Sequence, residues 1–360
     1  MKEPKKILVR SPNWIGDQVL AYPFYYFLRK AYPKAHITSL CVPWVEAVQF
    51  RDLVDQVVVL PRPRSPEIFD RFRAMEDAGR LLRKQGPWDL GISLPNSFSA
   101  AWILFRAGAK VRRGYSADGR GFLLNQSIPW VHERVEHRSD AYLKLLPFEG
   151  TFSGLEFWGT FPDNDLDPKI PGVLESFNAA KAWGNSPLEP PSEKYWVLAP
   201  GATAESRRWP TDRFAQLARN ISKETGWKGI VVGGAAEADL ANDLQTDSSL
   251  GLENWTNRGS VASYWKVFRN AQFTVGNDSG LSHVAALCGS PVQVIWGAGD
   301  SKRTQPIGPG RVKISIHPVE CWPCESNSCF RPFESRNQCL VGIQGDQVWK
   351  EIQSGIGIHF

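Results

Sequence analysis

One stretch decides the expected fold of this chain: Val275-Gly276-Asn277-Asp278-Ser279-Gly280-Leu281-Ser282-His283-Val284-Ala285-Ala286-Leu287. The apolar run 271–275 before it predicts a buried strand, and apolar residues recur at helical spacing after it. The order is therefore strand, polar turn and helix, with Asp278 and Ser279 as candidate N-caps. The start of such a helix presents unpaired N–H groups and a partial positive charge, which suits a phosphate. The alternative is that the turn serves only as a helix cap.

The size and charge of the chain limit the kinds of protein that it can be. With 360 residues it is long for one hydrophobic core and suits two domains. Its net charge of +5 is mild, and without a strong basic stripe we expect no nucleic-acid partner. No apolar run reaches the roughly 20 residues that span a bilayer. The start, Met1–Lys6, has no signal-peptide pattern, so we expect a cytoplasmic protein.

Strands and helices alternate along both halves of the sequence, which predicts an α/β fold with mostly parallel sheets. Ligands bind such sheets outside the carboxyl ends of the strands. A stretch between residues 150 and 193 is rich in Pro, Gly, Asn and Asp and predicts a linker region. We expect an N-terminal domain at 1–165, a linker at 166–193, a second domain at 194–345 and a C-terminal helix at 346–360 that packs back on the first domain.

Three glycine-bearing loops follow predicted strands in the second half, at 200–206, 233–237 and 276–280. Such loops converge on one crevice of an open α/β sheet. Arg207 and Arg208 supply guanidinium groups suited to a diphosphate, and Glu237 is a carboxylate able to accept from ribose hydroxyls. Together the loops predict a nucleotide-diphosphate site, whereas each loop alone is explained by a tight turn with solvated side chains.

In the first half, Asp17 follows the first predicted strand and is the candidate general base for a sugar hydroxyl. The alternative is an ordinary N-cap aspartate. Trp14 lies in the same loop and is a candidate to line a sugar site, and Asn96 follows another strand of this half. A loop asparagine is more often a turn former.

Several basic residues cluster in the first half of the sequence, and no acidic residue lies between Arg106 and Arg113. This cluster could hold a phosphate-bearing acceptor or contact anionic lipid, although a solvated face is the more frequent explanation. Its members are Arg62, Arg64, Arg106, Lys110, Arg112 and Arg113.

The sequence lacks two common nucleotide-binding motifs and contains one cysteine pattern. The chain has no P-loop, and the turn after the first strand has Gly16 alone, which argues against a dinucleotide oxidoreductase. Four cysteines near the C-terminus have the spacing C-x2-C-x4-C-x9-C, which leaves open reduced loop thiols or a structural zinc site. These are Cys321, Cys324, Cys329 and Cys339.

The chain resembles the ADP-heptose:lipopolysaccharide heptosyltransferases of glycosyltransferase family 9. Four segments in the same order carry the resemblance, and the last resembles a stretch of the heptosyltransferase II branch. They are Ile7-Leu8-Val9-Arg10-Ser11-Pro12-Asn13-Trp14-Ile15-Gly16-Asp17, Arg207-Arg208-Trp209-Pro210, Asn277-Asp278-Ser279-Gly280-Leu281-Ser282-His283, and Cys321-Trp322-Pro323-Cys324 with Cys329 and Cys339.

The resemblance implies a GT-B fold, in which two Rossmann-like domains face each other across a cleft, with the acceptor on the N-terminal domain and the donor on the C-terminal one. It implies an inverting, metal-independent transfer of heptose from ADP-heptose to a Kdo or heptose acceptor on lipid A, without a cofactor. Asp17 would be the base and Arg207 would neutralise the leaving diphosphate. The implied donor residues are Thr203, Arg208, Glu237, Asp278, Ser279, Gly280 and His283, and the acceptor residues are Asn13, Trp14, Asn96 and Arg113.

The partners expected from the resemblance are the nucleotide sugar and the lipopolysaccharide precursor, with the protein acting as a monomer and peripheral contact with the cytoplasmic face of the inner membrane. Two alternatives remain. One is a GT-B transferase or epimerase that uses another nucleotide sugar, and the other is a non-catalytic nucleotide- or glycan-binding protein.

Overall fold

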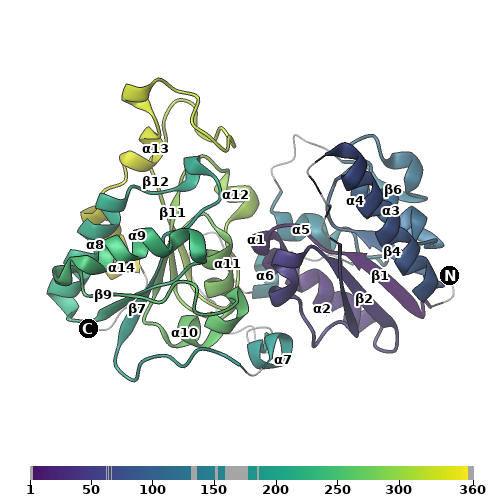
Figure 1. Ribbon diagram of the computed structural model, residues 1–360, viewed down its shortest axis with the longest axis horizontal. Coiled ribbons are helices and arrows are strands. Elements are labelled where there is room, and N and C mark those ends of the chain that lie inside the picture. The colour runs from purple at the N-terminus through teal and green to yellow at the C-terminus, as the bar shows by residue number, and fades with distance from the viewer. Residues whose placement is uncertain are drawn as a thin grey trace. The chain divides into compact units, whose positions relative to one another are not determined.

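The computed structural model describes residues 3–61, 63, 65, 67–130, 136–150, 153–158, 177–184 and 186–355. The chain divides into two compact units (Figure 1). The first comprises residues 1–157 and 180–183, and the second comprises 158–179 and 184–360. Each unit contains one parallel six-stranded sheet, which confirms the predicted α/β fold.

The sheet of the first unit has the strand order β3-β2-β1-β4-β5-β6. Its order reverses between β1 and β4, and in doubly wound sheets this reversal opens a crevice at the carboxyl ends of the two strands. The strands are β1 (Lys6–Arg10), β2 (His36–Cys41), β3 (Gln56–Val59), β4 (Leu90–Ser93), β5 (Val111–Tyr115) and β6 (Gln126–Ile128).

Helices and short 3₁₀ segments connect these strands. Two helices follow β1 and meet at Ala21, and Pro23 lies in the first turn of the second one. The helical elements are α1 (Ile15–Leu20), α2 (Tyr22–Ala31), η1 (Pro43–Val48), α3 (Ile68–Gln85), α4 (Phe98–Arg106), η2 (Gly121–Leu123), α5 (Arg138–Leu143), α6 (Gly154–Trp158) and α7 (Ala179–Trp183).

The sheet of the second unit reads β9-β8-β7-β10-β11-β12 from one edge, so it repeats the order of the first sheet. Its reversal lies between β7 and β10. The strands are β7 (Tyr195–Ala199), β8 (Lys228–Val231), β9 (Leu252–Asn254), β10 (Thr274–Asn277), β11 (Val292–Trp296) and β12 (Val312–Ile316). The principal helices are α8 (Thr211–Thr225), α9 (Ala238–Thr246), α10 (Trp265–Asn270), α11 (Gly280–Leu287), α12 (Ser301–Thr304), α13 (Gln338–Val341) and α14 (Gly345–Gly355).

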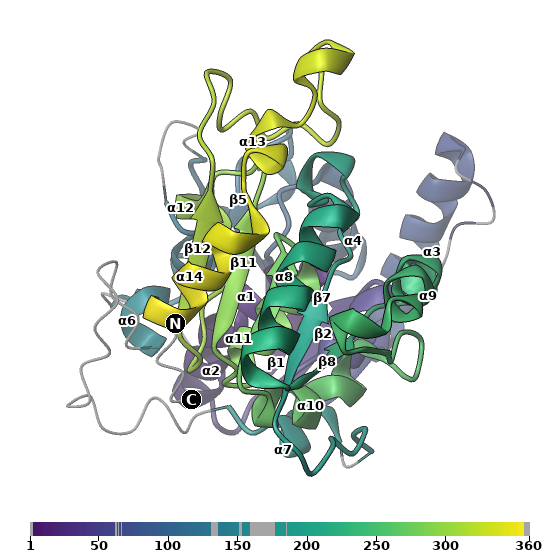
Figure 2. The ribbon, with the colours of Figure 1, turned by 90° about the vertical axis from the view of Figure 1, so that its left-hand side faces the viewer.

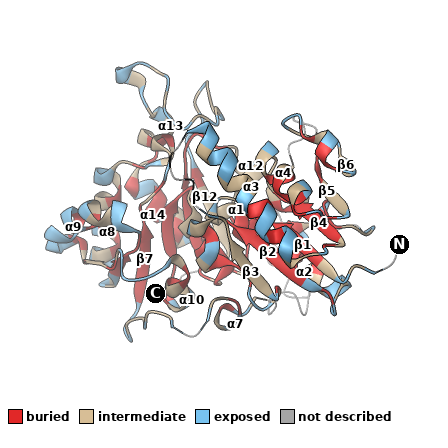
Figure 3. Ribbon diagram, turned by 45° about the vertical axis from the view of Figure 1, so that its right-hand side comes forward, coloured by how far each residue is buried: buried red, intermediate tan, exposed pale blue. Residues whose placement is uncertain are grey.

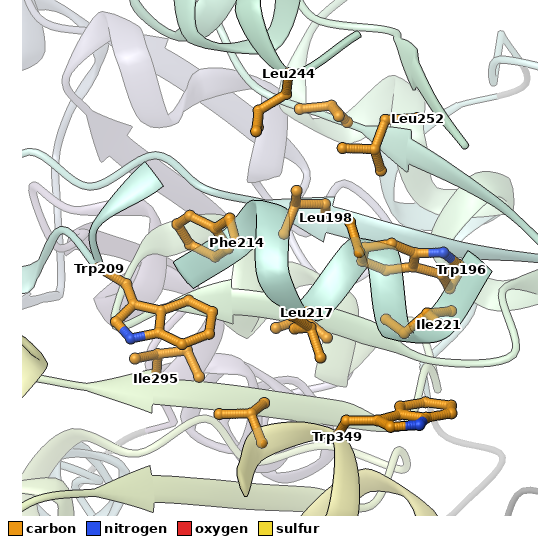
Figure 4. Close-up of a cluster of buried hydrophobic side chains, with 14 of the residues drawn as sticks. Trp196, Leu198, Trp209, Phe214, Leu217, Ile221, Leu244, Leu252, Ile295 and Trp349 are labelled. Atoms are coloured by element: carbon orange, nitrogen blue, oxygen red, sulfur yellow. The ribbon is translucent and has the colours of Figure 1, made fainter. Parts of the chain in front are cut away.

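The central strands are apolar and buried, as a sheet covered by helices on both faces requires (Figure 3). In the second unit, α8 places Phe214, Leu217 and Ile221 against the sheet at helical spacing (Figure 4). Trp209 packs edge-on against Phe214, with ring centroids 4.8 Å apart. The loop before α8 is therefore anchored in the core.

The C-terminal helix differs from its prediction. We expected it at 346–360, packed back on the first domain. The described part, α14, instead packs on α8 of its own unit, as seen in Figure 2, and residues 356–360 lie outside the described residues. Val348, Trp349 and Ile352 form the apolar stripe of the helix and belong to the core that α8 covers.

Two further boundaries differ from those expected. The predicted linker 166–193 includes α7, and the amide of Leu188 donates to the carbonyl of Ser263, so these parts are ordered against their neighbours. Much of the remaining linker, at 166–176 and 185, lies outside the described residues. The strand before the central loop is Thr274–Asn277 instead of 271–275. Within the described part of the chain, no helix is both long and apolar enough to cross a bilayer.

Candidate functional site

The strand-end loops of the second unit are joined by the side chain of Asn277, which is fully buried at the end of β10. Its amide nitrogen donates to the carbonyl of Pro200 at 2.6 Å, and its amide oxygen accepts from the backbone N–H of Trp209 at 3.1 Å. These two bonds hold both ends of the loop after β7 against β10. The predicted convergence of the loops at 200–206 and 276–280 is therefore observed.

An ion pair connects the same two loops. The Nε atom of Arg207 lies 3.3 Å from Oδ2 of Asp278. The carboxylate is buried, with 4% of its side chain exposed, whereas the guanidinium of Arg207 is 34% exposed. Gly299 borders the carboxylate, because a Cβ atom there would lie 3.0 Å from the same oxygen. The pair thus places a solvent-accessible cation at the reversal point of the sheet.

The third loop reaches this place through Glu237. One carboxylate oxygen accepts from the backbone N–H of Gly234 at 2.8 Å. A Cβ atom at Gly201 would lie 2.7 Å from the carboxyl group, so the glycine leaves the room that the carboxyl occupies. Glu237 therefore lies against the loop after β7, so the loops at 233–237 and 200–206 also meet.

Thr203 and Arg208 lie in the loop after β7, and both are exposed. The guanidinium of Arg208 turns back on its own loop, where Nε donates to the carbonyl of Ala202 at 2.7 Å and Nη2 to that of Thr203 at 3.1 Å. Arg208 therefore stabilises its own loop, whereas the guanidinium of Arg207 lies beside Asp278 in the loop after β10.

The helix of the opening stretch begins at Gly280, and Ser279 is its N-cap residue. The Ser279 hydroxyl does not cap the helix, and within the described residues it is a buried oxygen without a hydrogen-bond partner. His283 is buried one turn into the helix. The N–H groups of the first turn and the Ser279 hydroxyl are the donors that this loop can offer to an anion.

In the first unit, Asp17 lies in the first turn of α1, and the N-cap is Trp14, so the alternative of an N-cap aspartate is wrong. The side chain of Asp17 is 26% exposed, and its Oδ1 lies 3.9 Å from Nε of Arg138 at the start of α5. Asp17 is therefore a partly exposed carboxylate with a guanidinium beside it.

Asn13 and Trp14 belong to the loop before α1. The side-chain oxygen of Asn13 accepts from Arg10 Nη2 at 2.5 Å, and its carbonyl accepts from the indole N–H of Trp44 at 2.6 Å. Burial lowers the pKa of Arg10 to about 10, so this guanidinium remains charged at neutral pH. The rings of Trp14 and Trp44 are exposed. Hydrogen bonds from Arg10 and Trp44 thus hold the loop in place, and the rings of Trp14 and Trp44 remain exposed to solvent.

Asn96 follows β4, the strand beside β1 at the reversal point, and its oxygen accepts from Nη2 of Arg120 at 3.2 Å. The fully buried guanidinium of Arg120 also donates to the carbonyls of Pro95 and Ser97. Burial lowers the pKa of Arg120 to about 10. Arg120 therefore fixes the whole turn that carries Asn96.

Arg113 is not brought to this turn. It lies within β5, where its Nε donates to the carbonyl of Leu145 at 3.0 Å and its Nη2 to that of Lys144 at 3.4 Å. Of the other predicted basic residues, Arg62 and Arg64 lie outside the described residues, and Arg106 pairs with Glu76 at 2.8 Å.

The four C-terminal cysteines are free thiols. Burial, together with the neighbouring Cys324, Cys321 and Cys329, raises the pKa of the Cys339 thiol to about 11. Among the residues that the structure describes, no group of three or more His, Cys, Asp or Glu side chains is arranged to hold a metal ion. The zinc alternative for this loop therefore has no support in the geometry.

Sequence reasoning missed Arg10, Arg120 and Arg138. The first two are buried cations that bind backbone and amide oxygens, a role without a local sequence signal. Arg138 meets Asp17 from a helix more than a hundred residues away, which only the fold can reveal.

The chain is similar to known proteins in sequence and in fold. A family model described as glycosyltransferase family 9 (heptosyltransferase) matches residues 77–332. Lipopolysaccharide heptosyltransferase 2 of Escherichia coli is 26% identical over 310 residues, which cover 84% of this chain and 85% of that protein. Lipooligosaccharide heptosyltransferase 2 of Haemophilus ducreyi is 27% identical over 371 residues, covering 96% and 98%. The solved structure of E. coli ADP-heptose lps heptosyltransferase II has a similar fold, with a TM-score of 0.72, 21% identity and 98% coverage of both chains.

Proposed function

This chain belongs to glycosyltransferase family 9, the heptosyltransferases, and from that premise we propose that it transfers heptose from ADP-heptose to the inner core of a lipopolysaccharide precursor. The chain is a glycosyltransferase with two Rossmann-like sheets. The names of its relatives support heptose as the sugar and lipopolysaccharide as the acceptor class.

The observation that carries the proposal is that the loop after β7 contacts both other strand-end loops, through Arg207 beside Asp278 and through Gly201 beside Glu237. A nucleoside diphosphate needs cations and oriented N–H groups where the leaving-group charge develops. The loops offer the guanidinium of Arg207, the first-turn N–H groups of α11 and the Ser279 hydroxyl. In this proposal Glu237 accepts from ribose hydroxyls, and Thr203, Asp278, Gly280 and His283 line the remaining donor surface.

The acceptor belongs to the first unit in this proposal. Asp17 accepts the proton of the attacking hydroxyl, which then displaces ADP from the anomeric carbon with inversion. The proton passes to the carboxylate, the new glycosidic bond forms, and the bond to the diphosphate breaks. Asn13, Trp14 and Asn96 contact the acceptor, and Arg138 lies beside the carboxylate of Asp17. Leaving-group stabilisation by these protein groups makes a metal cofactor unnecessary, and we propose that the enzyme works as a monomer at the cytoplasmic face of the inner membrane.

The test is a transfer assay with purified protein, ADP-heptose and a truncated lipopolysaccharide acceptor, in which mass spectrometry follows the acceptor. We expect a mass increase of one heptose and release of one ADP for each transfer. A panel with UDP- and GDP-sugars examines the alternative donors. Turnover with one of those and none with ADP-heptose would replace the proposed donor, and binding of nucleotides without turnover on any acceptor would favour a non-catalytic role.

A further inference from the structure

Five exposed phenylalanines and the half-buried Trp102 form a group on the first unit, which we name the aromatic surface. They come from α3, α4 and η2, and α3 packs along α4 (Figure 1). The members are Phe69, Phe72, Phe98, Trp102, Phe105 and Phe122.

Ring contacts connect most of the group. Trp102 lies at its centre, with ring centroids 5.8 Å from Phe72, 6.1 Å from Phe98 and 5.8 Å from Phe105. Phe98 in turn lies 6.2 Å from Phe122. Phe69 is three residues before Phe72 on α3, which places both on neighbouring positions of one helix face.

The five phenylalanine rings lie outside the core, whereas Trp102 is half-buried against a small core cluster. Phe69 is 82% exposed and Phe122 is 75% exposed, and the other phenylalanines of the surface are also exposed. Ile68 adds a further exposed apolar side chain at the start of α3. Single exposed apolar residues are common, but connected patches of this kind mark interaction sites.

The segment that carries the aromatic surface has a net positive charge. Residues 67–125 contain ten Lys and Arg against six Asp and Glu, a net charge of +4 in a chain whose total is +5. One acid of this segment, Glu76, accepts from the indole N–H of Trp102 and from Nε of Arg106. Arg71 and Arg73 are exposed on α3, on either side of Phe72 in the sequence. The guanidinium of Arg112 lies 5.5 Å from the ring centre of Phe105.

The aromatic surface also adjoins the candidate acceptor turn. Phe98 begins α4 two residues after Asn96, and Phe122 follows two residues after Arg120, the residue that binds Asn96. A group docked on these rings would therefore lie beside the place where we propose that the acceptor sugar binds.

We propose that the aromatic surface docks the protein on an anionic lipid bilayer, with the rings inserted among the headgroups and the arginines paired with lipid phosphates. Aromatic side chains favour the membrane–water interface, and each basic residue near an anionic leaflet adds attraction. The link to a lipid-borne acceptor rests on the proposed function, whereas the binding itself follows from the exposed rings and the charge.

The experiment is co-sedimentation of the full-length protein with vesicles of phosphatidylcholine alone or with about a quarter of phosphatidylglycerol, without donor or acceptor. Wild type should bind the anionic vesicles more tightly, and high salt should weaken that binding. The double variant Phe69→Ser/Phe122→Ser should lower the partition coefficient by at least about tenfold on both vesicle types. Arg71→Glu/Arg73→Glu should lose about tenfold on the anionic vesicles only.

Phe333→Ser is the matched control, because Phe333 is 88% exposed in the second unit and lies outside the aromatic surface. It should bind like wild type, and circular dichroism and thermal melting should show that all variants fold. Wild-type protein that fails to bind anionic vesicles, or surface variants that bind as well as wild type, would overturn the inference. Concentration-dependent dimers that the aromatic variants abolish, without vesicle binding, would replace the bilayer by a second copy of the chain. Transfer activity on a soluble acceptor is independent of these results, so a failure of the proposed function is recognised separately.

Discussion

The Nε atom of Arg207 lies 3.3 Å from Oδ2 of Asp278, so a cation from the loop after β7 contacts a carboxylate from the loop after β10. The two strands are neighbours at the point where the order of the sheet reverses. The carboxylate is buried and the guanidinium is partly exposed, which means that Asp278 orients Arg207 while solvent, or a ligand, reaches it. An arginine oriented in this way needs little reorganisation when diphosphate charge develops beside it.

We expect Arg207→Met to lower kcat for heptose transfer by about 100- to 1,000-fold, because one oriented cation is removed from the leaving group. Steady-state kinetics with ADP-heptose measures the loss. Arg219→Met is the control, since Arg219 is an exposed arginine of α8 that pairs with Asp247. Equal losses in both variants would show that the effect is one of general charge.

Arg207→Met should also lower the free energy of unfolding, because it breaks the ion pair with Asp278. Removing Arg207 leaves the buried carboxylate of Asp278 without this partner, which should cost about 1–3 kcal/mol in the free energy of unfolding, less than for a fully buried pair because the guanidinium is partly exposed. The double variant Arg207→Met/Asp278→Asn should recover much of that stability in urea unfolding while activity stays low. Recovery of both properties would contradict a catalytic role for Arg207.

Asp17→Asn tests the proposed base. The amide keeps the shape of the side chain but accepts no proton at neutral pH, so kcat should fall by about 100- to 10,000-fold. Calorimetric titration should show ADP affinity close to that of wild type, because the donor residues belong to the second unit. Asp77→Asn, on the exposed side of α3, is the control and should remain active. Undiminished transfer by Asp17→Asn would remove the base assignment.

The absence of a side chain at Gly201 leaves space for the carboxyl group of Glu237 from a neighbouring loop of the proposed donor site. A double-mutant cycle can test whether the two residues act together. A Cβ atom there would lie 2.7 Å from the carboxyl group of Glu237, so Gly201→Ala should displace that group. We expect Gly201→Ala and Glu237→Ala each to weaken ADP binding by about 5- to 30-fold, the loss of roughly one hydrogen-bonding group. The double variant should bind no more weakly than Glu237→Ala alone. Additive losses in calorimetry would mean that the two residues act separately, and Asp239→Ala serves as the exposed control.

Much of this site was predictable because its signals are local. The strand-turn-helix pattern around Asp278 and the paired arginines before α8 are contiguous in sequence, and the order of strands and helices indicated parallel sheets. Which strands become neighbours is a property of the whole chain, so the contacts of Asp17 with Arg138 and of Asn96 with Arg120 had no sequence signal.

The role of Asn277 also could not be predicted from its neighbours in the sequence. A Gly-Asn-Asp-Ser-Gly run favours a turn, yet Asn277 ends β10 with its side chain in the interior. The reason lies in the loop after β7, whose buried backbone groups at Pro200 and Trp209 need partners that only a neighbouring strand can provide.

Replacing Asn277 by alanine should therefore destabilise the fold more than it changes the chemistry. The backbone N–H of Trp209 and the carbonyl of Pro200 would both be left unpaired, at about 1–3 kcal/mol for each buried group. We expect a loss of about 2–4 kcal/mol in urea unfolding. Asn270→Ala removes an exposed amide that bonds the carbonyl of Lys266, and it should change stability by less than about 0.5 kcal/mol. Comparable losses in the two variants would contradict a bracing role for Asn277.

The packing of α14 gives the last prediction. Ile352 is fully buried in the core beneath α8, and Lys350 is an exposed residue of the same helix. Ile352→Ala should lower the free energy of unfolding by about 2–5 kcal/mol because it opens a cavity, whereas Lys350→Ala should have little effect. Hydrogen exchange should quicken in α8 of the isoleucine variant, since α14 covers that helix. If exchange rose in the first unit while α8 stayed protected, the helix would pack as the sequence first suggested, and the assignment of α14 to the donor unit would be wrong.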